Sequence, residues 1–195
     1  MDTTQPDILS RHAIPWHRLT VQDYHRLGEA GVLGEDDRVE LLEGLLVDMA
    51  PIGPRHALVT DLLTELLVMA FAGRARVRVK NPVVLNDISE PQPDFAVVRR
   101  YEPGAPLAHP VPQDTFLLVE VSDSSLAFDR GFKLEIYAKA GIREVWIVDL
   151  TTNGVLVHRR PSGGSYQSVI RVEGAGILSV EALLGVTIRV ADLFL

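Results

Sequence analysis

The sequence predicts a mixed α/β or α+β domain in which a mixed central β-sheet is flanked by α-helices. Helical and strand patterns follow one another in the order helix, hairpin, helix, strands, helix, strand, hairpin. The strand patterns are short apolar runs bounded by Pro- and Gly-rich segments, which is typical of buried strands. The 195 residues, 47% of them hydrophobic, suit one globular domain with a sizeable core.

The chain is expected to begin with an N-terminal arm over residues 1–18, which is polar and contains proline. Residues 19–195 are expected to form the single domain. The first helix is predicted over residues 21–30, because Thr20 and Asp23 have the spacing of a capping box.

Residues 38–49 are predicted to form two strands that fold back at Glu43 and Gly44, with a helix left open as the alternative. The next helix is predicted over residues 55–71, where leucines recur at helical spacing and Gly73 follows the end.

The remainder of the chain is predicted to alternate strands with one long helix. That helix covers residues 126–140 and is followed by Gly141. The apolar tail from Leu178 is expected to return to the sheet. The predicted strands cover residues 75–80, 83–86, 94–98, 115–122, 143–150, 155–159 and 166–172.

Composition excludes several classes of protein. The chain has no cysteine, so disulfides and thiolate metal sites are absent and any metal must be held by oxygen or imidazole. The formal charge of −7 argues against coating nucleic acid by bulk electrostatics, but it is compatible with a nuclease that has a local basic groove. The N-terminus lacks the features of an export signal and no run is long enough to span a membrane, so a cytoplasmic protein is expected.

Glu120 interrupts the apolar run from Phe116 to Val121, which otherwise resembles a buried strand. A carboxylate in that setting needs a cation or a metal, because burying it alone costs several kcal/mol. Strand alternation puts Glu120 on one covered face with Phe116, Leu118 and Ser122.

Asp94 opens a second apolar strand directly after a proline. If the two strands are neighbours, Asp94 and Glu120 can converge on one ion. Hard oxygen ligands favour Mg²⁺ or Mn²⁺.

Lys133 interrupts the apolar side of the predicted helix in a similar way. At helical spacing it lies on the same stripe as Asp129, Ile136 and Tyr137, whereas Glu135 falls on the opposite side. A buried lysine requires a counter-ion, which a cluster of carboxylates, metal and phosphate supplies.

With Asp94 and Glu120, the chain resembles the PD-(D/E)XK nuclease superfamily, and more closely the Uma-type family of restriction-endonuclease-like proteins. One departure is that Ser122 replaces the lysine expected two residues after Glu120. Some members carry this lysine on the following helix, where Lys133 lies. The matching segments are Val39–Gly44, Met49–Pro51, His56, Pro91–Asp94, Glu120–Leu126, Asp129–Arg130, Lys133, Tyr137–Ala138, Gly141–Ile142 and Glu144–Asp149.

This resemblance implies a restriction-endonuclease-like core and a metal-dependent nuclease site. It also implies that Glu43 matches an acidic residue near the metal. The prediction is therefore an endonuclease dependent on Mg²⁺ or Mn²⁺ that hydrolyses DNA phosphodiester bonds. Glu43, Asp94 and Glu120 would hold the metal, and Lys133 would complete the catalytic set. No membrane partner is expected, and a homodimer or higher homo-oligomer, which the apolar tail over residues 183–195 could support, is the expected assembly.

Each site residue has a structural alternative. Glu120 could pair with an arginine such as Arg143, and Lys133 could bridge to Asp129 one turn earlier. Asp94 and Glu43 could simply be turn residues. His56, near a helix start, could contact phosphate or the metal, or act as a capping or surface residue.

Two broader alternatives also remain open. The basic residues Arg74, Arg76, Arg78 and Lys80 could bind backbone phosphates, or they could protect an edge strand from association. The protein itself could be a nuclease-derived binding or assembly module that no longer cuts, or a metal-dependent hydrolase of another phosphoester.

Overall fold

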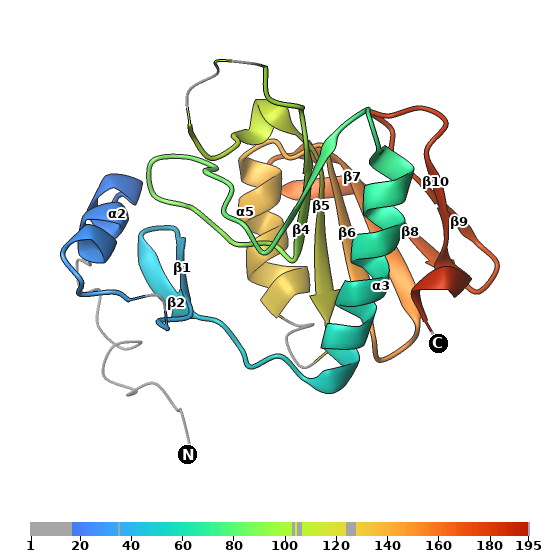
Figure 1. The fold of residues 1–195 in the computed structure, drawn as a ribbon, viewed down its shortest axis with the longest axis horizontal. Helices are drawn as coiled ribbons and strands as arrows, with labels where there is room; N and C mark the ends of the chain where they lie inside the picture. Colours follow the sequence, from blue (N-terminus) through green and yellow to red (C-terminus); the bar gives the residue numbers. More distant parts are fainter. Residues whose placement is uncertain (1–16, 35, 103, 105–106, 124–127, 195) are drawn as a thin grey trace.

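The computed structural model describes residues 17–34, 36–102, 104, 107–123 and 128–194. Most of the predicted arm over residues 1–18 and the first two residues of the predicted helix 126–140 lie outside this part of the chain. Within it, the predicted mixed sheet flanked by helices is confirmed (Figure 1).

A six-stranded sheet forms the centre of the molecule, with the strand order β3-β4-β5-β6-β7-β8. Only β5 and β6 run parallel; the other neighbouring strands are antiparallel. The parallel pair needs a crossover, which the helix between β5 and β6 supplies. The strands are β3 (Arg76–Val79), β4 (Phe95–Val98), β5 (Thr115–Ser122), β6 (Glu144–Asp149), β7 (Gly154–Ser162) and β8 (Ser165–Glu173).

Helices cover both faces of this sheet (Figure 1). α3 (Pro54–Phe71) packs Leu63, Leu67 and Phe71 onto the face formed by alternate residues of β4, β5 and β6. α5 (Leu134–Lys139) packs Leu134, Ile136 and Tyr137 onto the opposite face. The alternation of side chains along each strand therefore divides the core into two apolar clusters.

Two small hairpins lie beside the central sheet. β1 (Val39–Leu42) and β2 (Leu45–Asp48) form the predicted hairpin, and Glu43 and Gly44 occupy its turn with φ of 50° and 79°. Positive φ at both positions is the geometry of a type I′ turn, which suits tightly connected strands.

The C-terminal tail is the second hairpin and corrects one prediction. β9 (Ile177–Ser179) and β10 (Thr187–Arg189) pair only with each other, so the tail does not join the central sheet. Its apolar residues instead fill the α3-side cluster, where Val190 and Leu193 are completely buried. η3 (Val190–Leu193) ends this segment, and η1 (Pro112–Asp114) precedes β5.

The predicted strand over residues 83–86 is not formed, since Asn86 makes only an isolated bridge with Ser89. Val83 and Leu85 are nevertheless buried, but as residues of a loop. Their N–H groups donate to loop carbonyls, including that of Pro91, and no regular ladder forms. Pro91 has no N–H group, so it cannot donate a second hydrogen bond of the kind that a strand ladder needs.

The predicted face of Phe116 is also wrong. The β4–β5 register slips between Val97 and Val98, so Phe116 is an extra residue in β5 and packs against the α3-side cluster. Leu118, beyond the slip, points to the α5 side. A bulge of this kind reverses the alternation on one side of it.

The helix after β5 begins with wider turns than an α-helix. η2 (Asp129–Lys133) is a π-helical segment that leads directly into α5. Asp129 and Lys133 are nevertheless both buried on the sheet side, as the helical spacing predicted. Such π segments occur often at functional sites.

The first helix, α2 (Val21–Glu29), has the predicted capping box: the Thr20 N–H donates to Asp23, and the Asp23 N–H donates to Thr20 Oγ1. It buries no side chain and lies beside the β1–β2 hairpin (Figure 1). Among the described residues, no helix has the length and apolar character needed to cross a membrane.

Candidate active site

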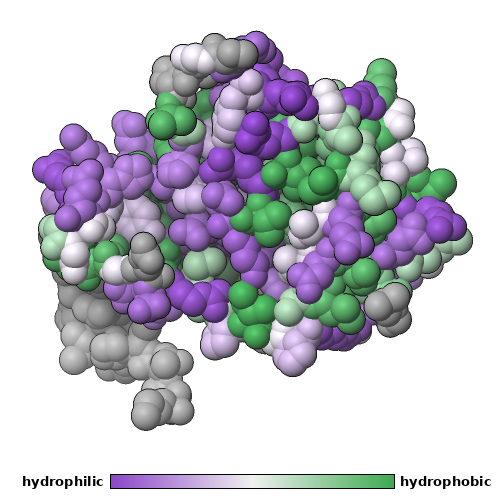
Figure 2. All heavy atoms as spheres, viewed as in Figure 1, coloured by the Kyte–Doolittle hydropathy of each residue, from purple (hydrophilic) through white to green (hydrophobic). Residues whose placement is uncertain are grey.

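An open cavity of about 430 Å³ lies where the β1–β2 hairpin, the beginning of α3, β5 and η2 meet. Its lining includes Asp94, Glu120 and Lys133, the charged residues that the sequence placed in apolar elements. Glu40, His56 and Lys80 also line it. Figure 2 shows hydrophilic and hydrophobic residues intermixed on one face of the molecule.

The acid pair comes from neighbouring strands. Phe95 pairs with Val119 across β4 and β5, so the next step of the ladder places Asp94 opposite Glu120 on the α5 side. The Val121 N–H donates to Asp94 Oδ2 at 2.8 Å and fixes the Asp94 carboxylate. The structure therefore brings these two predicted ligands to one side of the cavity.

Two cationic or potentially cationic groups approach Asp94 from other elements. His56 Nε2, in the first turn of α3, lies 3.3 Å from Asp94 Oδ2. Lys80 Nζ, just after β3, lies 3.9 Å from Asp94 Oδ1. Lys80 has a φ of 50°, an uncommon value for a residue other than glycine, and such conformations often occur at functional sites.

Lys133 occupies the centre of the acidic cluster. Its side chain is 6% exposed, and its Nζ lies 3.1 Å from both Glu40 Oε1 and Glu120 Oε1. The Gln92 N–H donates to the other oxygen of Glu40 at 3.0 Å. Glu120 thus has Lys133 as its cationic partner, where the structural alternative expected an arginine such as Arg143.

Two hydroxyl groups also donate to carboxylates of the cluster. The Tyr137 hydroxyl donates to Glu120 Oε1 at 2.5 Å, so this oxygen receives hydrogen bonds from both Tyr137 and Lys133. The Ser122 hydroxyl donates to Asp129 Oδ2 at 2.8 Å. Ser122, which stands where the superfamily lysine was expected, thus positions a helix carboxylate.

Burial raises the pKa of Glu120 to about 8; the ammonium of Lys133 opposes this shift, and the carboxylates of Asp129, Asp94 and Glu40 add to it. For Lys133, burial lowers the pKa, but Glu120, Glu40 and Asp129 outweigh it and raise the pKa overall. Several buried carboxylates share one ammonium, so the lysine stays charged while Glu120 retains a proton more readily.

Glu43 is not brought to this cavity. Its backbone forms the hairpin turn, and its carboxylate lies 3.6 Å from Arg18 Nη1 in a separate groove that also includes Lys139. Glu40, three residues earlier in β1, is the glutamate of this hairpin that lines the cavity and contacts Lys133. A sequence signal for Glu40 did exist, because it interrupts the apolar run Val39–Leu42 as Glu120 interrupts its own strand.

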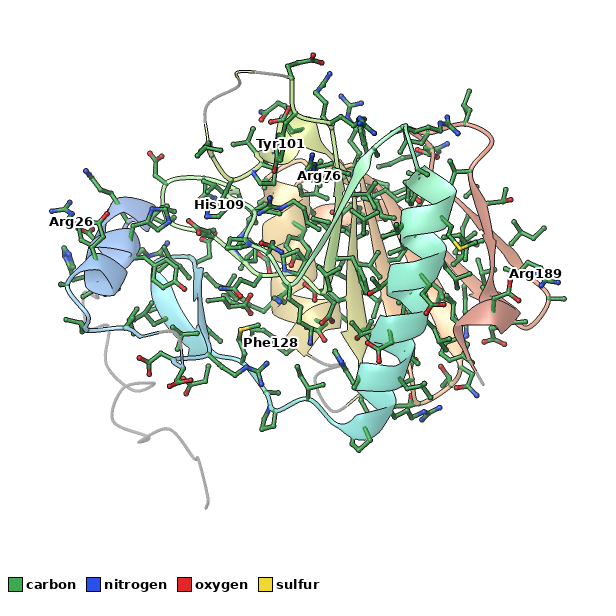
Figure 3. All side chains as sticks on the ribbon, in the orientation of Figure 1. Arg26, Arg76, Tyr101, His109, Phe128 and Arg189 are labelled. Atoms are coloured by element: carbon green, nitrogen blue, oxygen red, sulfur yellow. The ribbon has the colours of Figure 1, made fainter. Side chains whose placement is uncertain are left out.

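The residues of the basic stripe have different partners, and of the four Lys80 lines the cavity. β3 is an edge strand of the central sheet, which agrees with the interpretation that the charges protect an edge. Arg76 lies 4.7 Å from the ring centroid of Tyr101, and Figure 3 shows the two side chains next to each other. Arg78 donates to the Tyr101 hydroxyl, so of this stripe Lys80 is the residue that lines the cavity.

The donor set suits a hard divalent ion held mainly by two carboxylates. Asp94 and Glu120 offer oxygen ligands on one side of the cavity, and Mg²⁺ commonly uses one or two carboxylates together with water and substrate oxygens. Among the described residues, the carboxylate oxygens of Glu40, Asp94 and Glu120 do not all lie within 4.8 Å of one another. These three residues therefore do not form a ready-made cage of carboxylates. Glu40 is instead engaged by Lys133 and the Gln92 N–H.

Comparison with known proteins gives one family and one fold. The crystal structure of a "putative nuclease belonging to DUF820" from Anabaena variabilis superimposes with a TM-score of 0.70 and 16% sequence identity, covering 90% of this chain and 97% of that one. No curated protein matches the sequence. The model of the Uma2 family, described as "Putative restriction endonuclease", matches residues 21–191. Because that match covers most of the chain, this protein belongs to the Uma2 family.

Proposed function

We propose that this protein is a Mg²⁺- or Mn²⁺-dependent endonuclease that hydrolyses phosphodiester bonds in DNA. Its family and its fold both support a nuclease function in general. The observation that carries the specific proposal is the buried ammonium of Lys133 between Glu40 and Glu120, in the same cavity as Asp94.

Asp94 and Glu120 are the proposed metal ligands. A bound divalent ion would supply a water of lowered pKa and positive charge for the phosphate. Asp94 is held in place by the Val121 N–H, and Glu120 by Tyr137 and Lys133. Fixed ligands of this kind keep their geometry when substrate binds.

Lys133 acts in this proposal as a cation rather than as a base. Its raised pKa keeps the ammonium protonated, so it can orient Glu120 and offset negative charge that develops on the phosphate. Glu40 holds the other side of the ammonium and is therefore a positioning residue.

The entrance of the cavity offers further groups for a phosphate. Gly53, the N-cap of α3, lines the cavity and makes no side-chain capping bond, so backbone N–H groups of the first turn remain for an anion. Lys80 and Arg38 add positive charge to the lining. These groups can hold the DNA backbone locally although the whole chain is acidic.

The test is cleavage of plasmid and single-stranded DNA with Mg²⁺ or Mn²⁺ and with EDTA. We expect Asp94→Asn, Glu120→Gln and Lys133→Met each to reduce the rate by about 100-fold or more. Circular dichroism of every variant separates a catalytic defect from unfolding.

Glu40 and Glu43 provide a matched pair of variants, because they lie on one hairpin but only Glu40 enters the cavity. Glu40→Gln should impair cleavage, whereas Glu43→Gln should cleave as the wild type does. Equal rates for the wild type and the folded Asp94, Glu120 and Lys133 variants would refute the site.

The cleavage assay, together with Mn²⁺ calorimetry and a screen of small substrates, separates the two alternatives of an inactive binding module and a hydrolase of another phosphoester. A protein that binds no Mn²⁺ by calorimetry and cuts no DNA would be the inactive binding module. Metal-dependent hydrolysis of small phosphodiesters or nucleotides, without cleavage of DNA, would indicate a hydrolase of another phosphoester.

A further inference from the structure

A second cluster of metal-binding side chains lies outside the proposed active site. His25, Glu90 and His109 each offer one ligand atom, and these atoms lie within 4.8 Å of one another. We propose that these three residues bind a Zn²⁺ ion that stabilises the fold and takes no part in cleavage.

The three ligands come from segments far apart in the sequence. His25 is on α2, Glu90 precedes β4, and His109 is on the connection between β4 and β5. Figure 3 shows His109 on the loop next to α2. One ion would therefore tie three segments together, which is what structural zinc sites do in proteins.

The distances are close to those that a tetrahedral ion requires. His25 Nε2 lies 2.8 Å from Glu90 Oε2, and His109 Nε2 lies 3.9 Å from Glu90 Oε1. Zinc bonds of about 2.0 to 2.1 Å at the tetrahedral angle separate two ligand atoms by about 3.4 Å. Both histidine side chains are partly exposed, which leaves them room to rotate toward that spacing.

Charge also favours an ion at this position. The Glu90 side chain is 2% exposed, and its ion-pair partners among the described residues are these two histidines. An imidazole is a cation only when it is protonated, and a buried carboxylate is stable only when it is paired. Zinc would supply the positive charge with both histidines neutral.

The surroundings of His109 permit this binding mode. Its Nδ1 lies 3.4 Å from Arg78 Nη2, so ligation through Nε2 with a proton on Nδ1 would release that contact. Arg78 keeps the Tyr101 hydroxyl at 2.8 Å and the Pro82 carbonyl at 3.5 Å. The arginine is therefore not left without an acceptor.

The chemistry of the ligands selects zinc over magnesium. Two imidazoles and one carboxylate suit Zn²⁺ and its neighbours in the transition series, whereas Mg²⁺ prefers an all-oxygen shell. The ion would also have a structural purpose, because no residue of α2 is fully buried and the helix makes polar contacts with the domain such as that of the Val21 N–H with the Asp87 carbonyl. A metal link adds what apolar packing does not provide there.

The experiment measures Zn²⁺ binding by the full chain with Asp94→Asn, which disables the proposed active-site metal but keeps an acceptor for the Val121 N–H. Calorimetry should give one Zn²⁺ per chain, and Co²⁺ substitution should give the visible absorption of a tetrahedral site. His25→Ala and His109→Ala should each weaken Zn²⁺ binding by at least about tenfold. Zinc at about 100 times its Kd should raise Tm by about 5 to 10 °C, and both variants should lose most of this rise.

His17→Ala is the matched control, since His17 is an exposed histidine near the start of the same helix. It should bind Zn²⁺ as the parent does. Absence of Zn²⁺ binding by the parent, or equal affinity in the His25, His109 and His17 variants, would overturn the proposal. Neither result depends on nuclease activity, so the zinc site and the proposed function can fail separately.

Discussion

The two faces of the central sheet differ in what they bury. The α3 side is closed by apolar side chains from α3, the sheet and the C-terminal hairpin. The α5 side has its own apolar cluster, but Glu120, Lys133 and Asp129 are buried beside it. Apolar burial stabilises the fold, whereas buried charges cost free energy unless they are paired. Both faces therefore contribute apolar packing, but only the α5 side also has to accommodate the buried charges of the candidate site.

The strand β5 contributes to both faces at once. Val119 and Val121 point to the α3 side, and Leu118 and Glu120 point to the α5 side. The strand is thus anchored by its apolar residues while it presents a carboxylate. Four predictions test this division, in order of decreasing effect.

The largest effect is expected on the apolar face. Phe71→Ala removes a completely buried ring from α3 and should lower the free energy of unfolding by about 3 to 5 kcal/mol. DNA cleavage per folded molecule should not change, since Phe71 does not line the cavity. Urea denaturation measures the loss, and a loss below about 1 kcal/mol would contradict the assignment of stability to this face.

On the charged face, the metal-free protein should become less stable as the pH rises from about 4.5 to about 8. Glu120 in the unfolded chain releases its proton near 4.5, whereas the folded protein retains it up to about 8, so the folded state binds more protons in this window. Glu120→Gln should reduce the loss between pH 5 and pH 8 by about 3 to 4 kcal/mol.

The measurement is urea denaturation in EDTA at pH 5 and pH 8. Glu43→Gln is the control and should show the pH dependence of the wild type, because Glu43 lies outside the cluster. An identical pH dependence in Glu120→Gln and the wild type would mean that Glu120 is ionised in the fold at both pH values.

A smaller effect is expected from Tyr137→Phe. The ring remains packed, but Glu120 Oε1 loses the hydroxyl donor at 2.5 Å, at a cost of about 1 to 2 kcal/mol. Lys133 still binds the same oxygen, so cleavage should fall less than in Lys133→Met. Cleavage lost as completely as in Lys133→Met would give Tyr137 a more direct role.

The smallest effect is expected from Met69→Ala, two residues before Phe71 on the outer side of α3. Met69 is 74% exposed, so its truncation should change the free energy of unfolding by no more than about 0.5 kcal/mol. Urea denaturation alongside Phe71→Ala compares the two sides of one helix. Equal losses in both variants would show that the sheet side of α3 is not the source of stability.

The individual elements were largely predictable from the sequence, because their signals are local. The capping box of α2, the turn at Glu43 and Gly44, and the full extent of β5 were all expected from short patterns. The predictions that failed involved longer-range features. The Phe116 bulge and the separate tail hairpin depend on pairing partners that no local pattern specifies.

The candidate site shows the same division. Asp94, Glu120 and Lys133 were found because each is a charged residue in an apolar element, and the structure brings them to one cavity. Glu43 was predicted to lie at this site, but Glu40 is the glutamate of the hairpin that lines the cavity. The predicted turn already implied that Glu43 would leave the strand. Their roles in metal binding and catalysis stay predictions.

By itself, the sequence determined most of the segments that become helices and strands and the burial of Glu120 and Lys133, since both follow from the spacing of neighbouring residues. Only the tertiary structure decided which carboxylates meet Lys133, which face receives the tail, and that His25, Glu90 and His109 come together. These outcomes depend on contacts between segments far apart in the chain, and such contacts are set by the packing of the whole sheet and its two covering layers.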